Sequence, residues 1–132
     1  MTTKKFKIAL IEDDLAIVQM YRVKFENEGY DVAVAGDGEA GLALIDSQRP
    51  DIILLDLMMP NMNGLEVLKA LKDSGLRDKT KVVVLTNVGD SEAATDAYDF
   101  GADDYIIKAD LTPKEVADRI KQLLTGDPRV LA

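Results

Sequence analysis

The sequence predicts an α/β fold in which five β-α units build one open, doubly wound parallel sheet with helices on both faces. Apolar runs and segments of helical period alternate from one end of the chain to the other. Several of these runs are almost continuously apolar, as parallel strands covered on both faces require. The chain of 132 residues has the length of one domain, to which we assign residues 1–125, followed by a short tail at 126–132.

Three apolar runs have the composition of interior strands and two have that of edge strands. The interior candidates are residues 6–11, Ile52–Leu55 and residues 81–85. The run Asp31–Ala35 alternates in character, and residues 104–108 form a short run with charged ends, so both suit the edges of a sheet. Together they match the flavodoxin-like strand order 2-1-3-4-5.

The segments between the strands show helical spacing of apolar residues and recognisable helix ends. Thr112 and Glu115 form a capping box around Pro113, which predicts the start of the last helix. Gly29 and Gly101 are expected to end two of the earlier helices. The apolar positions that mark these helices are Leu15, Val18, Tyr21 and Phe25; Leu65, Leu68 and Leu71; Ala93, Ala97 and Phe100; and Val116, Ile120, Leu123 and Leu124.

The composition excludes several classes of function. Lys and Arg number 16 against 24 Asp and Glu, and the formal charge of -8 argues against direct binding of nucleic acid. The absence of Cys and His excludes disulfides, thiolate zinc sites and a phosphohistidine within this chain. Since no apolar stretch is long enough for membrane insertion or for a signal peptide, we expect a cytoplasmic protein.

Acidic residues follow two of the predicted interior strands. Glu12, Asp13 and Asp14 come directly after the first strand, and Asp56 comes directly after the third. In this arrangement the order in which strands are added reverses between those two strands, and ligands of open α/β sheets bind outside the carboxyl ends of the strands at such a point. Neighbouring carboxylates repel each other, whereas a bound Mg²⁺ favours their ionised forms. The sequence therefore predicts a Mg²⁺ site at this edge of the sheet.

Two further polar residues lie at the same edge. Thr86 follows the fourth strand with a hydroxyl group, and Lys108 ends the fifth strand with an ammonium group. A carboxylate nucleophile, a metal ion and two donors for phosphoryl oxygens are the groups that phosphoryl transfer requires. Each of these residues alone has an ordinary structural interpretation, so the prediction depends on their shared location.

Over nearly its whole length the chain resembles the receiver domain of two-component response regulators, of the stand-alone, CheY-like type. The stretches that carry the resemblance are LIEDD (10–14), LLDLMMPNMNG (54–64), VVVLTN (82–87) and FGADDYIIK (100–108). The resemblance implies that Asp56 accepts a phosphoryl group, with Mg²⁺, from a sensor histidine kinase or a phosphotransfer protein. It also implies a signalling protein that catalyses only its own phosphorylation and dephosphorylation, rather than an enzyme acting on other substrates.

The resemblance also implies roles for individual residues of the metal site. Asp13 is expected to bind the metal directly and Glu12 through water, with a carboxylate oxygen of Asp56 and the backbone carbonyl of Met58 as further ligands. A shift of one residue in the alignment would make Asp13 and Asp14 the acidic pair instead.

Thr86 and Tyr105 match the switch pair of the family, whose hydroxyl group and aromatic ring move together after phosphorylation, and Lys108 would hold a phosphoryl oxygen or the Asp56 carboxylate. A separate output protein is expected to bind the face of the fourth helix, fifth strand and fifth helix. Two positions depart from the family pattern: Ala109 replaces the usual proline, and Asn87 is bulkier than the usual small residue.

Three alternative interpretations remain. A phosphorylation-independent pseudo-receiver would share this fold, and a phosphatase or phosphotransferase could use an aspartyl-phosphate but would need a second acid and a substrate pocket. Residues 36–41 also spell the G-x-G-x-x-G pattern of dinucleotide-binding proteins. In that pattern Asp37 and Glu39 would place two carboxylates where a pyrophosphate binds, so we interpret Asp37 as a helix N-cap.

Overall fold

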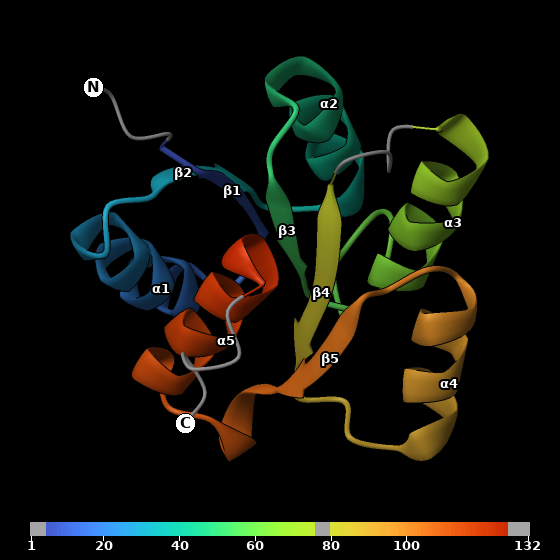
Figure 1. The fold of residues 1–132 in the computed structure, drawn as a ribbon. Helices are drawn as coiled ribbons and strands as arrows, with labels where there is room; N and C mark the ends of the chain where they lie inside the picture. The colour runs from blue at the N-terminus through green and yellow to red at the C-terminus, as the bar shows by residue number, and fades with distance from the viewer. Residues whose placement is uncertain (1–4, 76–79, 127–132) are drawn as a thin grey trace.

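In the computed structural model, which describes residues 5–75 and 80–126, five parallel strands form one sheet in the order β2-β1-β3-β4-β5 (Figure 1). The strands are β1 (Lys7–Ile11), β2 (Asp31–Ala35), β3 (Ile52–Leu55), β4 (Lys81–Thr86) and β5 (Asp104–Ile107). The helices are α1 (Leu15–Asn27), α2 (Gly38–Gln48), α3 (Gly64–Ser74), α4 (Ser91–Asp99) and α5 (Pro113–Thr125), with a short 3-10 turn η1 (Lys108–Asp110) before α5.

The predicted fold class and strand order are confirmed, and the boundaries differ by single residues. Phe6 lies outside β1, whereas Thr86 is the last residue of β4. Lys108 does not end β5, as the sequence suggested, but opens η1, because the pairing of β4 with β5 stops at Thr86 and Ile107. Of the predicted C-terminal tail, residues 127–132 lie outside the described part of the chain.

The sheet separates two apolar cores, because successive side chains of each strand point to opposite faces. On one face, α1 and α5 cover one set of strand residues; on the other face, α2, α3 and α4 cover the alternate set (Figure 1). The four residues of β3 show the alternation clearly: Ile52 and Leu54 pack toward α1 and α5, and Ile53 and Leu55 pack toward the other three helices. All four are fully buried, as an interior strand covered on both faces requires.

Side-chain caps fix where the helices begin. Asp37 accepts a hydrogen bond from the backbone N–H of Ala40, which confirms its predicted role as N-cap of α2. The predicted capping box of α5 is present, with Thr112 and Glu115 each accepting a hydrogen bond from the other's backbone. Because these caps lie at the carboxyl ends of the strands, they also set the lengths of the loops around that edge.

The helices are short compared with the thickness of a membrane. The longest ones, α1 and α5, have 13 residues each, whereas a bilayer span takes about 20 apolar residues. Within residues 5–75 and 80–126, every helix falls short of the length and apolarity that a membrane span requires.

The loop from β3 to α3 brings its first residues, Asp56 and Leu57, very close to Gly64, the first residue of α3. The backbone N–H of Gly64 donates to the carbonyl of Leu57 over 3.0 Å. A Cβ atom at Gly64 would lie 2.5 Å from the carbonyl oxygen of Asp56 and 2.7 Å from the Cα of Leu57. Glycine at this position therefore allows the loop to close directly behind Asp56.

We predict that Gly64→Ala lowers the free energy of unfolding by about 1–3 kcal/mol, because the added methyl group must displace backbone atoms of the loop. Gly36→Ala is the matched control, since a Cβ there has no neighbour within 4 Å, and we expect it to change the stability by less than about 0.5 kcal/mol. Urea denaturation of both variants measures the difference. Equal stabilities for the two variants would contradict the steric explanation.

Candidate functional site

Strand register brings the acidic residues together. Ile11 of β1 pairs with Leu55 of β3, so that the residues that follow them, Glu12 and Asp56, are neighbours. The backbone N–H of Asp56 donates to the carbonyl of Ile11 over 3.1 Å, which extends the pairing by one step. Both carboxylates are buried, with exposed fractions of 3% for Glu12 and 7% for Asp56.

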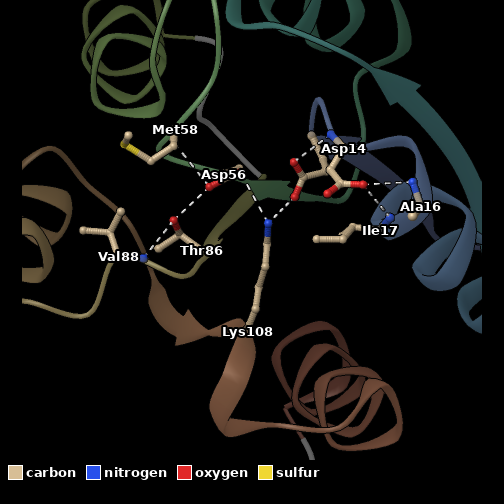
Figure 2. Close-up of polar contacts among 9 residues, drawn as sticks. Asp14, Ala16, Ile17, Asp56, Met58, Thr86, Val88 and Lys108 are labelled. Carbon is tan, nitrogen blue, oxygen red and sulfur yellow. Dashed lines mark hydrogen bonds and ion pairs between the residues drawn. The ribbon is translucent and has the colours of Figure 1, made fainter.

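The Asp56 carboxylate is held by donors from three residues, one in its own loop and two at the ends of β4 and β5 (Figure 2). The hydroxyl group of Thr86, which is fully buried, donates to Oδ1 over 2.8 Å. The backbone N–H of Met58 donates to the same oxygen over 3.2 Å, and Nζ of Lys108 lies 3.3 Å from Oδ2. The carboxylate is thus fixed in orientation by contacts to both of its oxygens.

Lys108 also forms a hydrogen-bonded ion pair with Oε1 of Glu12, so its ammonium group bridges the two buried carboxylates. Burial raises the pKa of Glu12 from 4.5 to about 7, and Asp56 contributes to the increase, although Lys108 and the backbone N–H of Asp14 oppose it. For Lys108, burial disfavours the charged form, but the hydrogen bond to Glu12 and the charge of Asp56 outweigh burial and raise its pKa. Lys108 is therefore a cation at neutral pH.

Asp13 completes a group of three carboxylates. One oxygen each from Glu12, Asp13 and Asp56 can be chosen so that all three lie within 4.8 Å of one another. Asp14, in contrast, caps α1: its Oδ1 accepts from the backbone N–H groups of Ala16 and Ile17, as Figure 2 shows. The structure thus brings Glu12 and Asp13 to Asp56 and assigns Asp14 to the helix start.

A cavity of about 390 Å³ opens above these residues. The cavity is lined by the carboxylates, by Lys108, by the carboxyl end of β4 and by the loops that follow β1 and β3. The side chain of Met58 is 67% exposed and points away from Asp56 in Figure 2, so at Asp56 this residue acts through its backbone. Asn87, which departs from the family pattern, is exposed and also lines the cavity.

A second set of contacts connects Thr86 with Tyr105. The backbone N–H of Val88 donates to the Thr86 hydroxyl oxygen over 3.3 Å, and the Tyr105 hydroxyl donates to the carbonyl of Val88. One residue of the loop after β4 therefore contacts both predicted switch residues. Val88 could not be identified from residue types, because its part in this connection is made entirely by backbone atoms.

The family model of the response regulator receiver domain matches residues 8–121 of this chain. Among curated relatives, the DNA-binding response regulator MtrA of Mycobacterium bovis is 38% identical over 125 residues, which are 94% of this chain and 53% of the relative. The response regulator ArlR of Staphylococcus saprophyticus is 35% identical over 123 residues, covering 93% of this chain and 54% of the relative. The chain spans about half the length of the curated relatives it matches.

Solved structures give the same result. A response regulator receiver domain protein, described as CheY-like, from Methanospirillum hungatei has a TM-score of 0.86 and 30% identity, covering 93% of this chain and 96% of that one. The Francisella response regulator 1452 receiver domain has a TM-score of 0.85 and 32% identity, covering 92% and 98%. Because the family match, the sequence relatives and the structural neighbours agree with the fold and the acidic edge of the sheet, this chain belongs to the response regulator receiver domain family.

Proposed function

We propose that this receiver domain accepts a phosphoryl group on Asp56 from a phosphohistidine of a sensor histidine kinase or phosphotransfer protein. The observation that supports this most directly is the convergence of Thr86, Lys108 and the Met58 backbone on one buried carboxylate. That carboxylate borders a cavity that opens to the surface. It is thus both oriented and accessible, as a nucleophile must be.

The three clustered carboxylates offer only oxygen ligands, and oxygen ligands suit Mg²⁺. We assign Asp13, Asp56 and the Met58 carbonyl as direct ligands and Glu12 as a ligand through water. The bound metal would supply neutralisation of phosphoryl charge. Glu12 fits this site, since a buried carboxyl group with a raised pKa gains from a nearby dication.

In the transfer step, a carboxylate oxygen of Asp56 forms the new P–O bond as the P–N bond to the partner's imidazole breaks. The imidazole leaves with the electron pair of that bond and takes up a proton. Lys108 and the Thr86 hydroxyl already contact the two oxygens of Asp56, so small movements would bring both donors to phosphoryl oxygens. Their role is to stabilise charge on the group in transfer.

The contacts that connect Thr86 to Tyr105 provide a route from the phosphoryl group to the surface. If the Thr86 hydroxyl turns toward a phosphoryl oxygen, the N–H of Val88 must follow it or lose its acceptor. The Val88 carbonyl holds the Tyr105 hydroxyl, so that a shift in this loop changes the position of the ring. Thr86 and Tyr105 are thus proposed as a switch that selects between two arrangements of one surface.

We place the output surface on α4, β5 and α5. Tyr98 of α4 is 48% exposed there, and Arg119 of α5 forms an ion pair with Asp104 of β5 over 2.7 Å. The relatives are named as a DNA-binding regulator and as response regulators, so an output partner or output domain is the expected target of this face. With a formal charge of -8, the domain itself is a poor candidate for direct contact with DNA.

We predict that Asp56→Asn abolishes phosphorylation while the fold remains cooperative, because an amide oxygen is a far weaker nucleophile than a carboxylate. Intact mass after incubation with acetyl phosphate and Mg²⁺ measures the added group. Asp90→Asn is the matched control: Asp90 caps α4 through Oδ1, and Asn caps equally well. Undiminished labelling of Asp56→Asn would refute the acceptor assignment. A wild-type protein that takes up neither phosphoryl group nor beryllofluoride would be a pseudo-receiver.

We predict that the affinity for Mg²⁺ falls about tenfold for each pH unit below 7, because the raised pKa of Glu12 makes protons compete with the metal. Isothermal titration calorimetry between about pH 5.5 and 7.5 tests this, and in Glu12→Gln the dependence should flatten. In the metal-free protein, the free energy of unfolding depends on pH in the opposite direction. Folding raises the pKa of Glu12 from 4.5 to about 7. The stabilisation from protonated Glu12 is therefore complete below a pH of 4.5 and is lost as the pH rises through about 7. If the affinity for Mg²⁺ depends on pH as steeply in Glu12→Gln as in the wild type, the titration belongs to another group.

We predict that Thr86→Ala still accepts the phosphoryl group but no longer transmits the change to Tyr105, because the substitution removes the hydroxyl that contacts both Asp56 and Val88. NMR spectra with and without beryllofluoride report this as chemical-shift changes around Asp56 that no longer extend to β5. Tyr105→Phe is the companion variant, since it removes only the contact to the Val88 carbonyl. Shift changes at β5 as large as those in the wild type would exclude Thr86 from the switch.

A further inference from the structure

The turn between β2 and α2, which carries the G-x-G-x-x-G pattern, contacts the middle of the β3–α3 loop. We infer that Asp37 and Gly38 are positioning residues for the loop at residues 57–63, and that they set the affinity of the site for Mg²⁺. This inference rests on the proposed function, in which that loop supplies the Met58 carbonyl to the metal.

The first contact is a hydrogen bond between side chains. Nδ2 of Asn61 donates to Oδ2 of Asp37 over 3.1 Å, while Oδ1 of Asp37 accepts from the backbone N–H of Ala40 over 2.8 Å. One carboxylate therefore both caps α2 and holds the loop. Asn61 has a φ of 68°, a left-handed conformation that Asn adopts more readily than most residues. The tip of the loop is thus turned so that this amide faces Asp37.

The second contact is steric and involves the backbone of both segments. Gly38 is buried against Met62, and a Cβ atom there would lie 2.2 Å from the Met62 carbonyl oxygen and 2.7 Å from its Cβ. No larger residue fits without displacing the loop. The start of α2 therefore serves as a surface against which the loop packs, which explains a glycine that the dinucleotide interpretation would have assigned to a phosphate.

These contacts fix a loop whose inner end already contacts the acceptor residue. The Met58 N–H donates to Oδ1 of Asp56, and the Gly64 N–H donates to the carbonyl of Leu57. Between these anchors, the contacts of Asn61 and Met62 with the start of α2 restrain the outer half of the loop. Loss of the outer contacts would leave the Asp56 carboxylate in place but free the Met58 carbonyl to move. We therefore expect weaker binding of the metal and an unchanged transfer step once the metal is bound.

The test uses Asn61→Gly, which removes the amide but retains the left-handed backbone. We expect the Kd for Mg²⁺, measured by calorimetry, to rise about three- to tenfold, as the loss of one hydrogen bond allows. The rate of phosphorylation by acetyl phosphate at saturating Mg²⁺ should stay within about twofold of the wild type. In the metal-free protein, heteronuclear NOE values at residues 57–63 should fall. An unchanged Kd would overturn the inference, as would an equal loss of rate at saturating metal.

A charge exchange provides the rescue. Asn61→Asp alone places a second carboxylate opposite that of Asp37. It should weaken Mg²⁺ binding although it adds negative charge. Combining it with Asp37→Asn restores one amide and one carboxylate at the contact, keeps the α2 cap and leaves the net charge as in the wild type. We expect the double variant to return to within about twofold of the wild-type Kd. Failure of the double variant to recover would overturn the inference.

Arg49→Gly is the matched control for backbone freedom. Arg49 also has a positive φ, of 48°, but it caps the opposite end of α2, away from the loop. Its replacement by Gly should leave the Kd unchanged. The wild-type protein separates this inference from the proposed function: if the wild type binds no Mg²⁺ and takes up no beryllofluoride, the proposed function fails. If it does both and the Asn61 variants match it, only the positioning role of the Asp37–Asn61 contact fails.

Discussion

The structure depends on one constraint, the pairing of β1 with β3, which places the carboxylates of Glu12 and Asp56 close together at the buried end of the sheet. Ile11 and Leu55 pair in register, so Glu12 and Asp56 become neighbours whatever their charge. Two like charges about 4 Å apart repel by roughly 4 kcal/mol at an effective dielectric constant of 20. The Lys108 ammonium group and the Thr86 hydroxyl offset this repulsion. Burial and the charge of Asp56 still raise the pKa of Glu12 to about 7. The other features of the site follow from this arrangement.

The fold could be predicted almost completely from the sequence, because its signals are local. The apolar runs of β1, β3 and β4 show burial on both faces, and the Thr112–Glu115 capping box marks the start of α5 within the sequence itself. The gathering of Glu12, Asp13 and Asp56 could also be predicted, since strand order alone places them at one edge. What could not be predicted are contacts between side chains and backbone across loops. Neither the preference of Lys108 for Glu12 nor the bond from Tyr105 to the Val88 carbonyl has a pattern of residue types.

The G-x-G-x-x-G stretch shows why a motif needs its surroundings. In this chain the second glycine, Gly38, does permit a close backbone approach, but the approaching group is the Met62 carbonyl of another loop and not a phosphate. Asp37 occupies the position at the helix start that a pyrophosphate would need, and it uses one oxygen for the cap and one for Asn61. The glycine is required for the same steric reason in both cases. Only the group that approaches the glycine differs. The carboxylate of Asp37 beside it indicates a backbone carbonyl rather than a phosphate.

The position of β5 has a consequence for how this domain is recognised. It is an edge strand of four residues that begins at Asp104, follows Asp103 and is followed by Lys108. A short strand with charged flanks offers few backbone groups for another strand to pair with, which protects a sheet edge against aggregation. A protein that approaches this side must therefore bind side chains of the helices and of β5, rather than continue the sheet. In the proposed switch, recognition of this kind would change when the Tyr105 ring moves, whereas an added strand would pair with the backbone in either arrangement.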